Sequence, residues 1–195
     1  MAQSHRDDDA AGDEERLAKV TIGRPQRLSG PIELRDYDPL WPAAFRRHAK
    51  RIRAALGRRV ARLEHVGSTS VPGLAAKPVI DIVLEVESSA DEPAYLPDLE
   101  AVGYALTIRE PDWFEHRLLS VPSKDVNLHV FSAACDETDR MIRFRDRLRT
   151  NAADRDLYAA TKRRLSAHDW TYMQQYADAK TAVVHEIMTR ASPAP

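Results

Sequence analysis

The stretch EHVGSTSVPGLAAKPVIDIVLEV, residues 64–86, decides the fold of this 195-residue chain. Its last eight residues, 79–86, are almost wholly aliphatic and predict a buried strand. Alternating apolar and polar residues at 60–66 predict a second strand just before it. The turn between the two strands is rich in glycine and serine, and such turns expose backbone N–H groups that receive phosphate oxygens. We therefore expect a strand–turn–strand unit with chemistry at its turn.

Helices and further strands are predicted on both sides of this unit. Asp38 as N-cap and Pro39 at the first helical position open a helix with an apolar stripe, which ends at Gly57. The remaining predicted elements are strands at 103–109, 117–121 and 126–131, the last two as an antiparallel pair, and helices at 90–101, 139–150, 154–167 and 171–190. Strands come first and helices last. We therefore expect an α+β fold, with helices packed on a mixed β-sheet and a C-terminal helical segment.

The composition limits the domain count and the class of protein. The chain carries 29 basic and 30 acidic side chains, whereas a dedicated DNA-binding domain usually has a clear basic excess. Residues 1–30 lack an aliphatic pattern and are predicted as a flexible N-terminal leader, followed by a single domain at 31–195. The polar, acidic start, the single cysteine Cys135 and the lack of a long uncharged run favour a cytoplasmic protein.

Charge is unevenly distributed along the chain. Residues 141–165 contain eight Arg or Lys and three Asp, which is a local basic excess within a neutral domain. Such a stretch is either an ordinary solvated helix face or an anion-binding surface. The second interpretation requires that the fold bring this stretch to the Gly-Ser turn.

The turn and the strand after it supply the candidate site residues. Gly67 permits unusual backbone dihedrals, and the hydroxyls that follow it either contact a ligand or cap a short helix. Asp81 lies within an apolar strand, where a carboxylate is costly unless it is paired or bound to a metal. Strand alternation puts His129 on the same face as Asp81 if their strands are neighbours. A carboxylate beside a phosphate-binding turn is the arrangement that nucleotidyl transfer requires.

Other phosphate-binding and catalytic motifs are absent from the sequence. The turn lacks the Gly-Lys-Ser/Thr ending of a Walker loop, and the chain has no GxGxxG motif. His185-Glu186 lacks the second histidine of HExxH, and no serine lies in a GxSxG motif. The Gly-Ser turn is therefore the leading candidate for phosphate chemistry.

With these motifs in view, the sequence resembles the GrpB family. The run from Glu64 to Ile82 is similar to the central signature of the family. Further family-like segments are Tyr37 to Pro42, the histidine-containing strand Asn127 to Phe131, and the C-terminal helices with Phe144 to Arg149, Tyr158, Lys162, Tyr176 and Lys180. The likeness extends over 32–191. It implies a nucleotidyltransferase-like fold and, because some bacteria fuse this domain to dephospho-CoA kinase, that kinase as a partner.

The resemblance also implies a function and roles for individual residues. A nucleoside triphosphate would bind with Mg²⁺ or Mn²⁺, and a nucleotidyl group would pass to an undetermined acceptor. Asp81 would hold the metal, and His129 would be a ligand or a base. The residues implied in phosphate binding are Gly67, Ser68, Thr69 and Ser70 in the turn, together with Lys77, Arg117, Arg145 and Lys180. Arg117 and His116 are both expected near the surface, and Arg117 is the stronger candidate because it enters a strand.

The implied metal site departs from the superfamily pattern of two carboxylates one residue apart and a third on a later strand. Val83 stands at the second position, and His129 at the third. Glu85 is ~13 Å along the strand from Asp81, too far to share one ion. Three accounts stay open: a one-metal site on Asp81 completed by Asn127 or by substrate, a softer metal bound through His129, or a binding protein that has lost catalysis.

Two alternatives to an enzyme follow from these observations. The missing carboxylate at Val83 favours a non-catalytic module that binds a nucleotide or a CoA precursor and assists a kinase. RNA binding through the basic helices is the weaker alternative, because the formal net charge of the chain is only −1.

Overall fold

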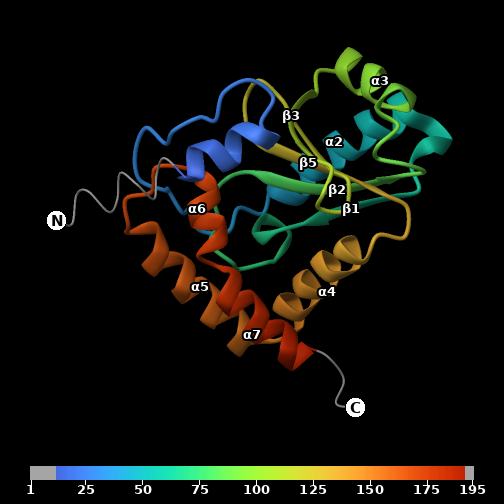
Figure 1. The fold of residues 1–195 in the computed structure, drawn as a ribbon. Coiled ribbons are helices and arrows are strands. Elements are labelled where there is room, and N and C mark those ends of the chain that lie inside the picture. Colours follow the sequence, from blue (N-terminus) through green and yellow to red (C-terminus); the bar gives the residue numbers. More distant parts are fainter. Residues whose placement is uncertain (1–11, 192–195) are drawn as a thin grey trace.

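The computed structural model describes residues 12–191, and a five-stranded mixed sheet lies at the centre of the fold (Figure 1). The strands are β1 (Arg62–Val66), β2 (Ile80–Val86), β3 (Ala105–Glu110), β4 (His116–Ser120) and β5 (Val126–Ser132). Their order across the sheet is β1-β2-β5-β4-β3. The central strands β2 and β5 run parallel, and the other neighbours are antiparallel, including the predicted pair β4 and β5.

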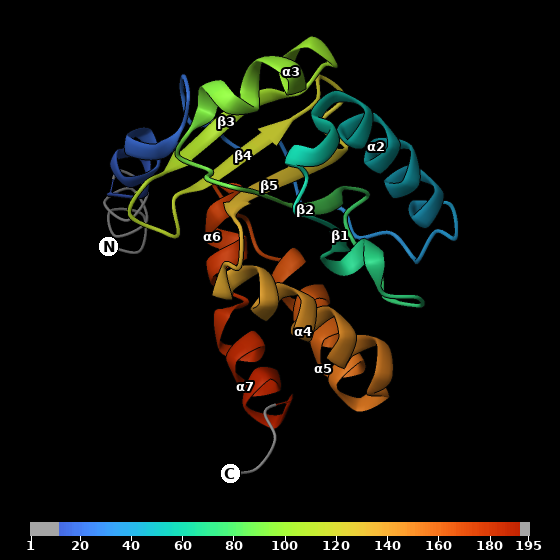
Figure 2. The same cartoon turned by 90° about the vertical axis from the view of Figure 1, so that its right-hand side faces the viewer.

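Helices cover both faces of the sheet (Figure 2). They are α2 (Trp41–Leu56), α3 (Leu96–Ala101), α4 (Asp136–Thr150), α5 (Ala152–Ser166), α6 (Met173–Asp178) and α7 (Thr181–Ala191), with 3₁₀ turns at Gly57–Arg59, Ser68–Ser70 and Glu92–Ala94. In both views α2 and α3 lie on one side of the sheet, and α4 to α7 form a C-terminal group on the other. The predicted α+β fold with a C-terminal helical segment is confirmed. None of the helices within residues 12–191 is long and apolar enough to cross a membrane.

The alternation of β2 explains why both of its faces are covered. Ile82 and Leu84 project into the main hydrophobic core beneath α2 and α3. Val83 projects the other way and packs with Val66 and Phe131 near α4. A strand that is apolar on both faces is typical of the centre of a layered sheet. Asp81 shares the face of Val83 and is therefore directed toward the C-terminal helices.

The start of α2 differs from the sequence prediction. The helix begins at Trp41 rather than directly after Asp38, and Pro42 lies in its first turn. Asp38 Oδ1 accepts a hydrogen bond from the Leu40 N–H at 2.8 Å, so its carboxylate stabilises the turn before the helix instead of capping the helix itself.

The predicted helix 171–190 is two helices rather than one. After α6 the Lys180 N–H bonds to the carbonyl of Ala177, only three residues back, which tightens and ends the helix. The chain then changes direction into α7 (Figure 1). Lys180 thus lies at the junction of two helices instead of within one.

Residues 12–30, predicted as part of a flexible leader, contact the rest of the fold. Residues 12–20 are helical, and the Tyr172 hydroxyl donates to Glu14 Oε2 at 2.6 Å. A single β-bridge joins Arg27 to Tyr172, and another joins Thr21 to β3. Residues 1–11 of the predicted leader lie outside the described residues.

Candidate functional site

The Gly-Ser turn closes directly on the carboxylate of Asp81. Gly67 has φ +67°, in the left-handed region that favours glycine. A Cβ atom added at Gly67 would lie 2.2 Å from Asp81 Oδ2. The Ser70 hydroxyl donates to the Gly67 carbonyl at 2.6 Å and so fixes the turn. Any side chain at residue 67 would push the turn away from the carboxylate.

Asp81 meets two side chains from the neighbouring strand. In the parallel register of β2 and β5 it lies opposite Asn127, whose Nδ2 donates to Asp81 Oδ1 at 2.9 Å. His129 Nε2 lies 3.8 Å from the same oxygen, so Asp81 and His129 share a face as the alternation predicts. The side chains of Asp81 and His129 are 27% and 20% exposed, and a ligand can therefore reach both.

Opposing effects determine the charge of Asp81. Burial by itself raises the pKa of a carboxyl group. The hydrogen bonds and charges of His129, Asn127 and Lys180 outweigh burial, and the pKa of Asp81 is lowered below its usual value. Asp81 is therefore an anion at neutral pH, and it can hold a cation or accept hydrogen bonds.

Three lysines approach this turn from distant segments of the chain. Lys77 comes from the loop before β2, Lys162 from α5, and Lys180 from the junction of α6 and α7. The ammonium of Lys162 donates to Ser68 Oγ at 3.0 Å and to the carbonyl of Ala75. Ser68 is thus hydrogen-bonded directly to a buried lysine, and its role in phosphate binding stays a prediction.

The other two lysines have uncharged neighbours. Lys180 Nζ lies 4.5 Å from the centre of the Tyr176 ring, and Lys77 Nζ lies 3.0 Å from Met173 Sδ. Among residues 12–191, no carboxylate lies within ion-pair distance of Lys77, Lys162 or Lys180. These three lysines therefore have no direct ion-pair partner among the described residues, and the charge of Asp81 acts on them from a longer distance.

Burial lowers the pKa of all three lysines, and the charge of Asp81 opposes this shift in each case. The pKa of Lys162 falls to about 7, with Lys180 and Arg163 contributing repulsion. The pKa of Lys180 falls to about 8, with Lys77 contributing repulsion. A bound anion would stabilise the charged form of each lysine. This balance of charge is typical of an anion-binding pocket.

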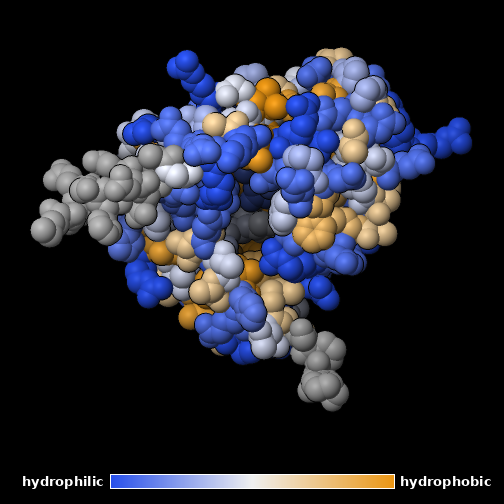
Figure 3. All heavy atoms as spheres, viewed as in Figure 1, coloured by the Kyte–Doolittle hydropathy of each residue, from blue (hydrophilic) through white to orange (hydrophobic). Residues whose placement is uncertain are grey.

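The molecular surface is hollowed in this region. In the view of Figure 3 a depression opens between α6 and the sheet. A ligand that entered there would meet the start of β2 on one side and the C-terminal helices on the other.

His116 and Glu110 extend the site behind His129, and the sequence analysis did not predict either role. His116, expected near the surface, is only 3% exposed. Its Nε2 lies 3.1 Å from His129 Nδ1, and its Nδ1 lies 2.7 Å from Glu110 Oε2. The missed signal is the pairing of β4 with β5, which sets Leu118 opposite His129 and so places His116 on the same face.

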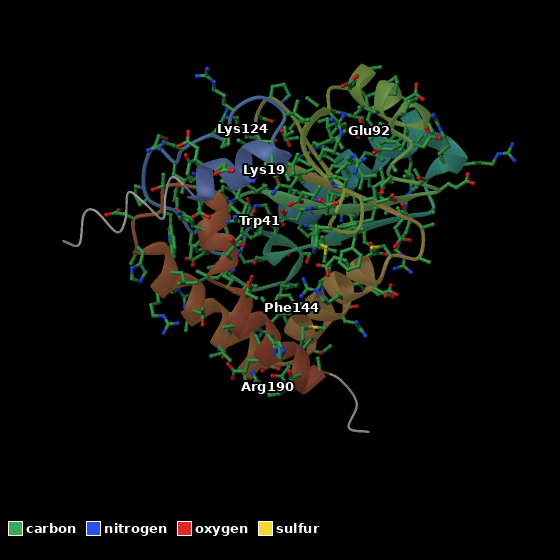
Figure 4. The ribbon with its side chains drawn as sticks, viewed as in Figure 1. Lys19, Trp41, Glu92, Lys124, Phe144 and Arg190 are labelled. Atoms are coloured by element: carbon green, nitrogen blue, oxygen red, sulfur yellow. The ribbon has the colours of Figure 1, made fainter. Side chains whose placement is uncertain are left out.

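Arg117 does not reach the site, and its predicted role is wrong. It lies opposite Val130 on β5, and its side chain is therefore directed to the other face of the sheet. Arg117 is buried, and its Nε donates to Glu92 Oε1 at 2.5 Å. Figure 4 shows Glu92 beside α3, on the side of the sheet away from the C-terminal helices. Adjacent residues of a strand face opposite ways, so His116 rather than Arg117 faces His129.

Thr69 and Ser70 do not present free hydroxyls to a ligand, which corrects their predicted role. The Thr69 hydroxyl donates to the Val79 carbonyl at 3.2 Å, and its oxygen lies 3.1 Å from His65 Nε2. The Ser70 hydroxyl is used within the turn. Both residues are buried and hold the turn in shape. Ser68 is the residue of the turn whose hydroxyl contacts a lysine, Lys162.

Arg145 supports β1 instead of joining the three lysines, contrary to its predicted role. Its guanidinium donates to Glu64 Oε2 at 2.7 Å, to the His65 carbonyl at 3.0 Å and to Asp146. Arg149 donates to the carbonyl of Ser70 at 2.9 Å. The basic stretch 141–165 thus reaches the Gly-Ser turn, but these arginines already have partners, and Lys162 is its member in the pocket.

The residues around Asp81 do not form a two-metal centre. Val83 is fully buried among apolar side chains, and the buried Glu85 lies 3.7 Å from Arg62 Nε. Within residues 12–191 no three His, Cys, Asp or Glu side chains are grouped so that they could hold a metal ion. The protein supplies one carboxylate with His129 and Asn127 beside it, which does not fit a resident pair of ions.

Comparison with known proteins identifies the family. The family model described as GrpB protein matches residues 31–190. The chain belongs to the GrpB family. A UPF0157 protein of Halalkalibacterium halodurans is 58% identical to this GrpB chain over 179 residues, which cover 92% of each. The crystal structure of GrpB from Enterococcus faecalis, at 31% identity, superposes with a TM-score of 0.72 over 82% of this chain and 96% of that chain.

Two weaker similarities concern proteins with named activities. The dephospho-CoA kinase of Mycobacterium bovis is 32% identical to this GrpB chain over 158 residues, which cover 78% of this chain and 35% of the kinase. The Cid1 poly(U) polymerase is 12% identical, with a TM-score of 0.44 over 76% of this chain and 47% of that one.

Proposed function

We propose that this GrpB chain binds a nucleoside triphosphate and transfers its nucleotidyl group to a hydroxyl-bearing acceptor. The observation that carries the proposal is the group of three lysines without carboxylate partners beside Ser68 and Asp81. A triphosphate would supply the missing negative charge, and the backbone at Gly67 would lie against it. Asp81 and His129 lie beside each other at one end of this proposed triphosphate site. We expect the reaction in the cytoplasm, where nucleoside triphosphates are made and used.

The proposed reaction is a single displacement at the α-phosphorus. The acceptor hydroxyl attacks this atom, its O–H bond breaks, and the proton passes to His129 Nε2. A new bond forms between the acceptor oxygen and phosphorus as the bond to the bridging oxygen breaks. The electron pair leaves with pyrophosphate, whose charge Lys162 and Lys180 stabilise.

A divalent cation enters this proposal as part of the substrate, bound to the triphosphate as Mg²⁺ or Mn²⁺. Bound there, the ion would neutralise charge on the phosphate oxygens. Asp81 is the carboxylate within reach of such a complex, and its lowered pKa keeps it ionised. One protein carboxylate suffices when the phosphates themselves provide the other oxygen ligands.

Calorimetric titration with each nucleoside triphosphate, with and without Mg²⁺ or Mn²⁺, tests the proposal. We expect metal-dependent binding, followed by pyrophosphate release when the protein is incubated with a pool of hydroxyl-bearing metabolites. Failure of every triphosphate to bind would overturn the proposal as a whole. Binding without pyrophosphate release from any acceptor would favour the non-catalytic alternative below.

Replacing Lys180 with methionine should weaken triphosphate binding by about tenfold or more, because one ammonium no longer meets the phosphates. The melting temperature should stay level or rise, since a buried charge without a carboxylate partner is removed. Lys50→Met, at an exposed position on α2, is the matched control and should leave binding unchanged. If the wild type and Lys180→Met bound the triphosphate with equal affinity, Lys180 would not be part of the proposed site.

Triphosphate affinity should fall as the pH rises from 7.5 to 9, because the pKa of Lys162 is about 7 and that of Lys180 about 8. In the free protein Lys162 has already lost most of its proton at pH 7.5 and Lys180 loses its own in this range, and binding must restore both. Each proton taken up weakens the apparent affinity by up to about tenfold per pH unit. Titrations in two buffers of different ionisation enthalpy measure this uptake directly. Proton release on binding would contradict the assignment.

The second candidate is a non-catalytic module that binds a nucleotide or a CoA precursor. It is favoured by the fully buried Val83, which stands where a second metal carboxylate is expected. Dephospho-CoA kinase is the partner that this alternative suggests, because a kinase of that name resembles this chain over 158 residues. Under this alternative the lysine pocket would keep its role in binding, and His129 would have none in proton transfer.

A further inference from the structure

A separate cavity of about 640 Å³ lies beside the edge strand β1. Figure 2 shows β1 between α2 on one side and the helices α4 and α5 on the other. Neither Asp81, His129 nor the three lysines line this cavity. We call it the arginine cavity, because four arginines from three helices line it together with a phenylalanine and a glutamate: Phe45, Arg46, Glu64, Arg145, Arg149 and Arg155.

Positive charge exceeds negative charge in the arginine cavity. Glu64 is the one carboxylate among its described lining residues, and it accepts a hydrogen bond from Arg145 at 2.7 Å. Asp146 pairs with Arg145 at 2.8 Å and with Arg149 at 3.3 Å. Four arginines and these two carboxylates leave two positive charges. That excess is close to the negative charge of a phosphate monoester at neutral pH.

Two of the four arginines keep most of their N–H groups available. Within residues 12–191 the guanidinium of Arg46 has no hydrogen bond or ion pair. The guanidinium of Arg155 has one long hydrogen bond in the described part of the chain, to the Leu148 carbonyl at 3.4 Å. A guanidinium carries five N–H donors, and a pair of them matches two oxygens of a phosphate or a carboxylate. A phosphate monoester has three terminal oxygens and can therefore accept from both arginines, whereas a carboxylate has two.

Aromatic rings form the apolar part of the arginine cavity. Phe45 stacks on His65 with ring centroids 4.8 Å apart and planes within 8° of parallel, and both residues line the cavity. Phe45 is half-buried, so part of its ring stays accessible. Flat apolar groups pack well against such a surface. A ligand with a ring next to its phosphate would use both parts of the cavity.

We propose that the arginine cavity binds an organic phosphate monoester, with its phosphate at Arg46 and Arg155 and an aromatic ring against Phe45. This site goes beyond the proposed function and does not depend on it. It gives a role to the basic stretch 141–165, which supplies three of the four arginines. Arg149 also connects the cavity to the Gly-Ser turn, because it donates to the Ser70 carbonyl at 2.9 Å.

Titration of the ¹⁵N-labelled protein with phenyl phosphate at pH 7.5, followed by amide ¹H–¹⁵N spectra, tests this assignment. We expect saturable shifts at residues 43–46 and 63–65, which line or adjoin the cavity. Methyl phosphate lacks the ring and should bind about 3–10-fold more weakly. Benzoate carries the ring with a carboxylate and should bind about tenfold more weakly.

The double variant Arg46→Met/Arg155→Met should weaken phenyl phosphate binding by about tenfold or more, because both available guanidinium groups are lost. Its fold should be unaffected, since Arg46 has no protein partner and Arg155 has one weak bond. Arg47→Met/Arg164→Met is the matched control. It removes the same charge from exposed positions on α2 and α5 that do not line the cavity, and it should change the affinity less than about twofold.

Three outcomes would overturn the proposal. Shifts confined to residues 178–182, around Lys180, would place phenyl phosphate at the lysines instead. Equal weakening by the two double variants would mean attraction by overall charge and no specific site. Benzoate binding as tightly as phenyl phosphate would make the cavity a site for aromatic carboxylates. Failure of every nucleoside triphosphate to bind would overturn the proposed function and leave the shifts at residues 43–46 in place, so the two proposals fail separately.

Discussion

Gly67→Ala is expected to lower the free energy of unfolding by about 2–5 kcal/mol and to abolish triphosphate binding. Part of this loss comes from the backbone, because φ at Gly67 is +67° and an L-residue is strained there. The rest comes from contact, since the new Cβ would lie 2.2 Å from Asp81 Oδ2 and 2.9 Å from Asp81 Cβ. The neighbouring atoms belong to a short side chain on the central strand, so the turn itself must move.

Gly73→Ala is the matched control for this prediction. Gly73 also has a positive φ, +78°, but a Cβ there would meet nothing within 4 Å. It should lose only the backbone contribution, about 1–2 kcal/mol, and should retain triphosphate binding. Urea denaturation followed by circular dichroism measures both variants. Equal losses for the two would mean that the turn does not press on Asp81.

Asp81→Asn is expected to reduce metal-dependent transfer by about a thousandfold or more, because the site loses the one carboxylate that can approach the metal–triphosphate complex. The change should have the opposite effect when no metal is present. The carboxylate repels free triphosphate, and the bound phosphates can replace Asp81 in stabilising the charge of Lys77, Lys162 and Lys180, so its removal should maintain or tighten metal-free binding. Calorimetry in EDTA and in Mg²⁺ measures both effects on one protein.

Asp112→Asn, in the exposed turn after β3, is the control for this change of charge. It should alter neither titration. If Asp81→Asn weakened binding equally with and without metal, Asp81 would support the shape of the pocket, and the proposed contact with the metal would be wrong. If neither titration changed, the triphosphate would bind elsewhere.

The strand–turn–strand core of the site was predictable because it is encoded locally. Gly67 and Asp81 lie in one short stretch, and strand alternation alone relates Asp81 to His129 once their strands are neighbours. The α+β class followed from the order of the elements. These inferences depend on the spacing of residues along the chain, which can be read directly from the sequence.

The rest of the site depends on pairings that the sequence does not state. Arg117 and His116 are adjacent in β4, and only the register with β5 decides which one faces His129. Thr69 and Ser70 carry suitable hydroxyls, but the tightness of the turn uses them internally. Lys162 enters the pocket because α5 packs beside the turn, a long-range contact between residues more than 90 positions apart in sequence.

The contacts of residues 12–30 with α6 have a consequence for the rigidity of the pocket. A helix of only six residues has too few internal hydrogen bonds to keep its direction by itself. Gln175 donates to Asp13 at 2.8 Å, and Arg16 lies 3.1 Å from Asp178, so the helical segment at residues 12–20 stabilises the position of α6. This segment lies outside the stretch that matches the family, residues 31–190. The position of the Lys180 ammonium thus depends on a part of the chain that the matched family domain does not include. Relatives that share every residue around the three lysines can therefore differ in how rigidly those residues are held.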